Sequence, residues 1–292
     1  MKKYSFIVVL VFPLIVFSQA GTEIFLLDVH WKGKTISLNN PINITNHIGY
    51  DNQPFFDLKK PVIYYTSDRD SMSNTDIKIY NYKTNVSSFL TNTPVNEYSP
   101  TETPDGKFIS CIIARKKPFA QDLGKYPIKG GAAEILINNM VVGYHSWIDD
   151  HRLLLFILDD TAHNSLHYYD LLTKEDRLII KTPGRSLSKI PGQHAMSFID
   201  KTDPKIWLIK RLELLSQQVS VITPTLPGQE NMVWTKNGMI IMSDGTDLFY
   251  FDPKNKGEWS KINFIQHNPA IKGITRLALN ADNSKMAIVV KE

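Results

Sequence analysis

YSPTETPDGKFISCIIAR, residues Tyr98–Arg115, carries the clearest structural signal in this 292-residue chain. Pro104 presets its backbone φ at about −65°, Asp105 can hydrogen-bond its own backbone, and Gly106 accepts a positive φ without a Cβ clash. These three residues suit a tight turn between antiparallel strands. Residues 108–113 are apolar but for one serine, and a short apolar run bounded by turn residues is typical of a buried strand. The stretch therefore predicts a β-hairpin.

The same pattern continues and then recurs along the chain. Residues Asp122–Ile137 form a second strand pair with Gly130-Gly131 at its bend, so one unit is a four-stranded antiparallel sheet. Weaker copies of the first hairpin, aligned on its turn, occur at Gln53–Ser67, Tyr144–Leu158, His194–Lys210, Met232–Ser243 and Ile274–Val290. With the first hairpin included, the turns fall near Lys60, Gly106, His151, Asp203, Gly238 and Asn283. Six turns spaced about 45 residues apart predict an all-β, six-bladed β-propeller, whose blades have that length.

The two ends of the chain complement each other. Thr22–Asp28 is a predicted strand with no inner hairpin before it, and Thr35–Thr45 is its partner. At the other end, Ile274–Val290 is an inner hairpin with no outer strands after it. Pairing of the N-terminal strands with the C-terminal hairpin would complete one blade and remove the exposed edges of an open array. We therefore expect a closed ring.

The outer strands of the blades follow from the same alternation of apolar segments and turns. The sequence predicts them at Thr75–Tyr82, Asn85–Thr91, His167–Asp170, Asp176–Lys181, Asp247–Asp252 and Trp259–Ile265. The fourth unit is predicted to be compressed, because Leu212–Leu214 and Val219–Ile222 leave room for only a very short outer hairpin.

The composition is that of a folded protein, since 42% hydrophobic and 11% aromatic residues suffice for a core. No linker interrupts the repeats, and we expect residues 21–292 to form one domain. A formal net charge of +4, spread along the chain, argues against a nucleic-acid partner. The single cysteine, Cys111, cannot form an internal disulfide and lies in an apolar strand, where we expect a core residue.

Residues 1–20 resemble a secretory leader more than part of the fold. Lys2-Lys3 match the positively charged n-region of a signal peptide, and Phe6–Phe17 is an apolar run too short to span a bilayer. Ser18-Gln19-Ala20 matches the small-residue pattern of a cleavage site. We expect cleavage after Ala20, with cleavage after Ser18 as the competitor. The chain is then predicted to be exported, to the periplasm or beyond, and not membrane-spanning.

Several motifs resemble the WD-like repeat of TolB-type propellers. They are Thr75-Asp76-Ile77, Asn92-Thr93-Pro94, Tyr98-Ser99-Pro100 and Pro104-Asp105-Gly106, with Val142–Trp147 and Gly184–Leu187 similar to the third and fourth blades of such exported proteins. The resemblance spans the predicted domain and implies a six-bladed propeller that contacts a protein or ligand in the envelope of a Gram-negative bacterium. Strands are predicted directly after the leader, where TolB carries an α/β domain, so a Tol–Pal partnership is not carried over.

In a propeller, the innermost strands of all blades begin at one mouth of a central tunnel, so the side chains there converge. Polar groups that converge on a concave surface are the default candidates for a binding site. The residues at these positions that we select as ligand-binding candidates are Asp51, Asn52, Glu97, Tyr98, Tyr144, His145, His194, Glu230, Asn231 and Arg276.

Catalytic motifs are not found in the sequence. Gly184-Arg185-Ser186-Leu187-Ser188 lacks the second glycine of a G-x-S-x-G elbow, and there is no phosphate-binding glycine loop, C-x-x-C or H-E-x-x-H. His145, His194 and a carboxylate such as Glu97 could form a metal site, because imidazole and carboxylate are suitable ligands. Solvation of a wet tunnel mouth would equally explain these polar residues.

The repeat and the lack of a catalytic constellation favour a non-catalytic scaffold without a cofactor. We expect it to bind an envelope protein, a peptide or a small ligand at the tunnel mouth. One alternative is a metal-dependent lactonase- or hydrolase-like propeller with Asp51, Glu97, His145 and His194 as ligands. Another is a structural subunit that contacts its partner through the outer rim. No feature predicts an oligomeric state.

Overall fold

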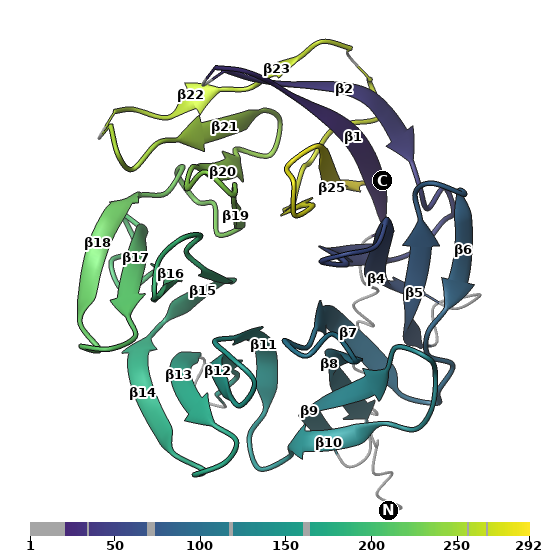
Figure 1. Cartoon of the computed structure of the whole chain (residues 1–292), viewed down its shortest axis with the longest axis vertical. Coiled ribbons are helices and arrows are strands. Elements are labelled where there is room, and N and C mark those ends of the chain that lie inside the picture. The colour runs from purple at the N-terminus through teal and green to yellow at the C-terminus, as the bar shows by residue number, and fades with distance from the viewer. Residues whose placement is uncertain are drawn as a thin grey trace, which may run out of the picture.

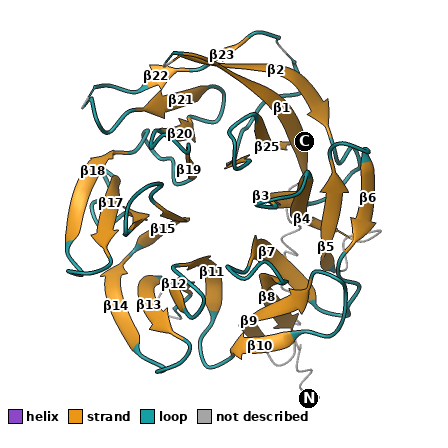
Figure 2. Ribbon diagram, in the orientation of Figure 1, coloured by secondary structure: helices purple, strands orange, loops and turns teal. Residues whose placement is uncertain are grey.

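The computed structural model describes residues 21–33, 35–68, 74–116, 119–159, 164–255, 257–266 and 268–292. The regular structure in these residues consists of 25 β-strands in six sheets, arranged around a central axis (Figures 1 and 2). The predicted all-β, six-bladed propeller is therefore confirmed. The predicted leader, residues 1–20, lies outside the described residues. None of the described segments forms a helix with the length and apolarity needed to cross a membrane.

The first three blades are four-stranded antiparallel sheets in chain order, and we number blades by the order of their innermost strands. Blade 1 contains β3 (Asp51–Phe56), β4 (Val62–Asp68), β5 (Thr75–Asn81) and β6 (Val86–Phe89). Blade 2 contains β7 (Asn96–Glu102), β8 (Phe108–Lys116), β9 (Phe119–Pro127) and β10 (Glu134–Ile137). Blade 3 contains β11 (Val142–Trp147), β12 (Arg152–Ile157), β13 (Ser165–Asp170) and β14 (Asp176–Lys181).

The β7–β8 turn forms as its sequence predicts. Gly106 has a φ of 68°, and its N–H donates to the Thr103 carbonyl at 2.8 Å. Asp105 Oδ1 accepts from Thr103 Oγ1 at 2.6 Å and from the Lys107 N–H at 3.1 Å. The carboxylate thus accepts a side-chain hydrogen bond from before the bend and a backbone hydrogen bond from after it, as an aspartate at such a turn can.

Blades 4 and 5 follow the same plan. Blade 4 contains β15 (Pro183–Lys189), β16 (Ala195–Asp200), β17 (Leu208–Glu213) and β18 (Val219–Pro224). Blade 5 contains β19 (Met232–Trp234), β20 (Ile240–Ser243), β21 (Leu248–Phe251) and β22 (Ser260–Lys261).

The predicted inner hairpin of blade 4 is wrong by one strand. Its turn lies at Gly192, which has a φ of 72°, and not at Asp203. The apolar segment that the sequence places innermost is β16, the second strand, and the true innermost strand is the polar PGRSLSK of β15. The sequence does not reveal β15 because Leu187 is its only large apolar side chain and the strand lines the tunnel, so it lacks the apolar run of a buried strand. The outer hairpin, β17–β18, is consequently of ordinary length.

The sixth blade closes the ring between the two chain ends. Its strands, from the tunnel outward, are β24 (Arg276–Leu279), β25 (Lys285–Lys291), β1 (Thr22–Lys32), β2 (Thr35–Asn43) and β23 (Asn263–Phe264). The predicted pairing of the N-terminal strands with the C-terminal hairpin is confirmed, because β1 pairs antiparallel with β25 from Thr22↔Lys291 to Asp28↔Lys285. The predicted strand Trp259–Ile265 is split at buried Ile262: β22 stays in blade 5, and β23 joins β2 in parallel.

The core consists of apolar layers between neighbouring blades, and two tryptophans carry hydrogen bonds across them. Trp147 Nε1 of β11 donates to Ser110 Oγ of β8 at 2.9 Å, and Trp234 Nε1 of β19 donates to Ser197 Oγ of β16 at 2.7 Å. Each indole therefore joins a blade to the one before it. Cys111 is fully buried in one such layer, which confirms it as a core residue, and burial raises the pKa of its thiol well above the ordinary value.

Candidate functional site

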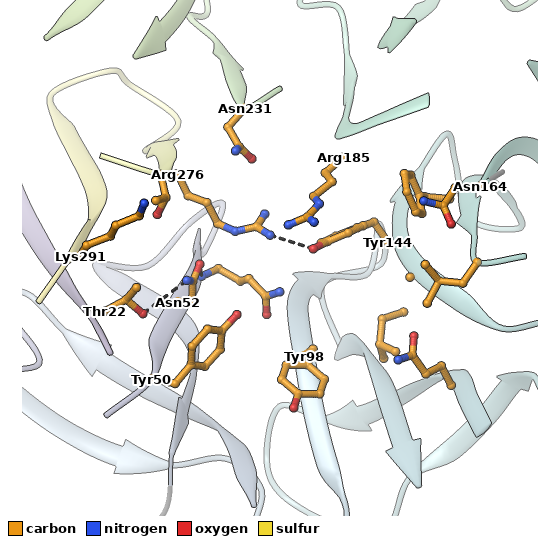
Figure 3. Close-up of a pocket in the computed structure, with 17 residues that line it drawn as sticks. Thr22, Tyr50, Asn52, Tyr98, Tyr144, Asn164, Arg185, Asn231, Arg276 and Lys291 are labelled. Carbon is orange, nitrogen blue, oxygen red and sulfur yellow. Dashed lines mark hydrogen bonds between the residues drawn. The ribbon is translucent and has the colours of Figure 1, made fainter. Parts of the chain in front are cut away.

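A cavity of about 540 Å³ opens where the innermost strands begin, at one mouth of the tunnel (Figure 3). Besides Gly143 and the aliphatic Ile112 and Leu158, its wall combines three kinds of side chain. The cations are Arg185, Arg276 and Lys291, the aromatic residues are Tyr50, Tyr98, Tyr144 and Phe156, and the amides and hydroxyls are Thr22, Asn52, Gln53, Gln121, Asn164, Asn231 and Thr275. No aspartate or glutamate is among the described residues that line it.

Irregularities in the innermost strands direct these side chains into the tunnel. The strand register shifts in β3, β7, β11 and β15, next to Asn52, Tyr98, Tyr144 and Pro183. A β-bulge of this kind bends the strand and re-aims a side chain. Gln53, in the β3 bulge, has a φ of 58°. Left-handed conformations of non-glycine residues cost on the order of 1–3 kcal/mol and cluster at functional sites.

The Gln53 side chain is held in place by its neighbours. Its Oε1 accepts from the Ser99 N–H at 2.7 Å and from Thr66 Oγ1 at 2.9 Å, so it connects blades 1 and 2. Ser99 also has a positive φ, 55°, and both residues precede a proline. The two bulges thus hold each other in shape, and this part of the wall is preorganised.

Arg276 and Tyr144 meet across the tunnel from opposite blades, 6 and 3 (Figures 1 and 3). Arg276 Nη2 donates to the Tyr144 hydroxyl at 2.8 Å, and the guanidinium carbon lies 5.2 Å from the ring centroid. A second chamber of about 180 Å³ shares both residues with the mouth cavity, together with Gln53, Arg185 and Asn231. These five residues therefore separate the mouth from the deeper tunnel.

The three cations differ in how far they are neutralised. Arg185 Nε lies 3.1 Å from Glu230 Oε1, and Lys201 Nζ lies 2.9 Å from Glu230 Oε2. Among the described residues, Arg276 and Lys291 have no carboxylate partner, and Arg276 instead uses the neutral Tyr144 hydroxyl. The mouth therefore has a surplus of positive charge.

The aromatic residues form two edge-to-face pairs. The ring centroids of Tyr50 and Tyr98 are 6.4 Å apart, and those of Tyr144 and Phe156 are 5.5 Å apart. Burial raises the pKa of Tyr50 well above its ordinary value, so its hydroxyl keeps its proton and remains a donor. Guanidinium, ammonium, amide and phenol groups around one hollow suit an anionic group attached to a flat or apolar body.

Five of the ten candidate residues line the mouth cavity: Asn52, Tyr98, Tyr144, Asn231 and Arg276. Tyr50, Gln53 and Thr275 also line the cavity and are immediate neighbours of expected positions, whereas Arg185 and Lys291 are not. Arg185 would have been found if β15 had been recognised as the innermost strand of blade 4. Gln121 and Asn164 come from β9 and from the segment before β13, and no sequence signal places them at the tunnel.

Asp51 and Glu97 do not line the mouth, because successive side chains on a strand point to opposite faces. Glu97 is fully buried and accepts from Tyr126 OH at 2.9 Å and Thr93 Oγ1 at 2.5 Å. Burial raises the pKa of Glu97 to about 7. Asp51 is also fully buried, with His47 Nδ1 2.9 Å from its Oδ2, and burial raises its pKa as well.

The remaining candidates are His145, His194 and Glu230. His145 is buried with its Nε2 2.7 Å from Ser110 Oγ, and burial lowers its pKa to about 3, so the ring is neutral. His194 is exposed on the β15–β16 turn, at the far end of β15 from the mouth, because the inner hairpin lies one strand earlier than predicted. Glu230 flanks the cavity through its ion pair with Arg185.

The four side chains of the predicted metal set are therefore in separate surroundings. Glu97 lies with Tyr126, Asp51 with His47, and His145 with Ser110, while His194 is on the opposite face. Within the described part of the chain, no group of three or more histidine, cysteine, aspartate and glutamate side chains could hold a metal ion.

The fold and site define a six-bladed β-propeller with a basic, aromatic tunnel mouth. The sequence matches no family model and no curated protein. Among solved structures, a putative TolB from Agrobacterium tumefaciens gives a TM-score of 0.71 at 10% identity, over 94% of this chain and 99% of that one. TolB from Acinetobacter baumannii gives 0.57 at 11% identity over 93% of this chain, which spans 64% of that structure's length.

An oligogalacturonate lyase in complex with manganese gives a TM-score of 0.60 at 10% identity, over 94% of this chain and 99% of that one. At such identities the likeness shows the fold, which is that of the TolB-like propellers. Because the similar structures include an enzyme, this fold is compatible with binding and with catalysis.

Proposed function

We propose that this protein is a non-catalytic binding propeller whose tunnel mouth takes an anionic group of its ligand. The observation that carries the proposal is the mouth cavity of about 540 Å³, whose described lining residues include three cations and no carboxylate. Ligand pockets in proteins are about 300–1,000 Å³ and combine apolar walls with a few convergent polar groups. The ligand class that fits is a carboxylate-bearing small molecule or the acidic end of a peptide.

Arg276 is the group best placed to bind the carboxylate. Its guanidinium has no carboxylate partner among the described residues and presents a planar fork of donors, which matches a carboxylate in two parallel hydrogen bonds. Arg185 also lies between the mouth cavity and the deeper chamber, but its ion pair with Glu230 partly neutralises its charge. Tyr50, Tyr98 and Phe156 supply flat surfaces for the ligand body.

A non-catalytic role is supported by the wall itself. Among the described residues that line it there is no histidine or carboxylate, the groups that most often act as general bases near neutral pH. The enzymatic alternative draws its support from the likeness to a lyase that holds manganese. Its predicted metal ligands, however, are not brought together in the described residues.

We further propose that the protein acts in the cell envelope after export. The leader-like residues 1–20 support this location, as does the likeness to TolB structures. A protein or peptide of the envelope would then be the partner. The rim-contact alternative predicts that variants at the mouth leave partner binding unchanged.

Calorimetric titration with matched pairs of small molecules tests the proposal. Galacturonate and galactose, or glutarate and glutaramide, differ in their carboxylates and little in shape. We expect the acid of a pair to bind and the neutral member not to bind, and we expect Arg185→Gln/Arg276→Gln to abolish the difference. Lys83→Gln/Lys129→Gln is the control, because it removes two exposed charges on blades 1 and 2. Equal binding of the acid by both double variants would contradict the proposal.

A further inference from the structure

A second and larger cleft, of about 1,140 Å³, lies between blades 4 and 5. One side is formed by β18, and the other by the turns that follow β19 and β21. These turns are at the end of the strands opposite to the tunnel mouth, since the innermost strands begin at the mouth and run away from it. The cleft and the mouth are therefore separate sites on opposite faces of the ring.

The cleft has an apolar floor and a positively charged wall. Ile190, Trp234 and Phe251 form the floor and are almost fully buried. Trp259 packs on Phe251 with 5.5 Å between ring centroids and donates from Nε1 to the Pro224 carbonyl at 3.2 Å, which bridges the two blades beside the cleft. The base of the cleft is therefore apolar and closely packed.

Three cations line the cleft, and no described lining residue is acidic. Arg211 already has partners within the protein: it forms an ion pair with Glu213, and its Nε donates a hydrogen bond to Gln193 Oε1 at 2.9 Å. Lys236 and Lys254 are exposed and make no ion pair with another described residue. The charge available to a partner is therefore positive and comes from blade 5.

The opposite side of the cleft is a sheet edge that no other described strand pairs with, although the Pro224 carbonyl at its end accepts from Trp259. β18 is the outermost strand of blade 4, and the corresponding strand of blade 5, β22, has only two residues. Proteins usually protect such edges with charged residues, proline or a covering segment. β18 reads VSVITP: it has no charged residue, its proline is at the very end, and Val221 is 56% exposed.

We propose that this cleft binds an extended, acidic peptide segment of a partner protein by strand addition to β18. Backbone hydrogen bonds to the β18 edge would hold the segment, apolar side chains on one of its faces would lie beside the exposed Val221 of β18, and carboxylates would pair with Lys236 and Lys254. A six-residue strand spans about 20 Å, so a segment of five to seven residues matches the edge.

Fluorescence anisotropy with three dye-labelled hexapeptides tests this proposal on the whole chain. The first peptide alternates glutamate and valine, the second alternates lysine and valine, and the third is the acidic peptide with alternate backbone nitrogens methylated. We expect saturable binding of the acidic peptide, no binding of the lysine peptide, and at least about tenfold weaker binding of the methylated one, because it cannot pair with an edge strand.

Variants locate the bound peptide. Lys236→Glu/Lys254→Glu is expected to weaken the acidic peptide about tenfold, while Lys83→Glu/Lys129→Glu, which reverses two exposed lysines on other blades, leaves the affinity unchanged. Arg276→Gln should also have no effect, which separates the cleft from the mouth. The proposal would be overturned if the acidic peptide failed to bind. It would equally be overturned if both double variants lost the same affinity for that peptide, or if Arg276→Gln weakened its binding.

Discussion

Glu97→Gln should change how the stability of the protein depends on pH. The Glu97 side chain is fully buried, and burial raises its pKa from the ordinary 4.5 to about 7. Between these two values the folded protein holds a proton that the unfolded chain has released. The free energy of unfolding therefore falls as the pH rises through this window: the contribution is complete below 4.5 and is lost above about 7.

The size of the effect follows from the same two values. Each tenfold difference in proton affinity is worth about 1.4 kcal/mol, so the fall in stability amounts to about 3 kcal/mol. Glutamine keeps the shape of the side chain and a hydrogen-bonding oxygen for Tyr126, but it does not titrate. The pKa of Asp51 is also raised, and that of His145 is lowered to about 3. Both residues are present in both proteins, so their contributions to the pH dependence of stability cancel in the comparison.

Urea unfolding followed by tryptophan fluorescence at pH 5, 6, 7 and 8 measures the difference. The stability of Glu97→Gln relative to the unmodified protein should rise by about 2–3 kcal/mol from pH 5 to pH 8. A constant difference between the two proteins across this range would refute the reasoning, because it would mean that Glu97 titrates normally in the fold.

Two substitutions test the packing between strands. Trp234→Phe removes the indole donor to Ser197 Oγ and should lower the free energy of unfolding by about 1–3 kcal/mol in the same urea assay, whereas Trp259→Phe, at a partly exposed site, should cost less. Gly184→Ala places a Cβ 2.8 Å from the Cβ of Ile199 and should cost about 1–3 kcal/mol. Gly257→Ala, with nothing within 4 Å, is the control and should change stability by less than about 0.5 kcal/mol.

The sequence predicts the ring because the turn chemistry repeats and because the two ends lack complementary halves of one blade. Five of the six inner hairpins lie where their turns indicate. The exception, in blade 4, shows the limit of periodicity. A strand that lines a tunnel is polar on its exposed face, and β15 also begins with proline and glycine, so its pattern does not distinguish it from a loop.

The site is harder to predict than the fold for a geometric reason. Position along the chain identifies where an innermost strand begins, but alternation decides which of two neighbours faces the tunnel. Tyr144 lines the mouth while His145 is buried between blades, and Tyr98 lines it while Glu97 is buried. Bulges reset that alternation, and no composition signal reveals a bulge.

The account rests on recognition of an anion by Arg276 at the tunnel mouth. An NMR titration that follows the arginine Nε–Hε signals tests this most directly, with galacturonate as ligand and galactose as its neutral match. We predict that the Arg276 signal shifts saturably with the acid, because its bond to the Tyr144 hydroxyl is exchanged for the carboxylate, and that it does not move with the neutral sugar. The same response to both sugars, or an Arg276 signal that stays still in both titrations, would contradict the account.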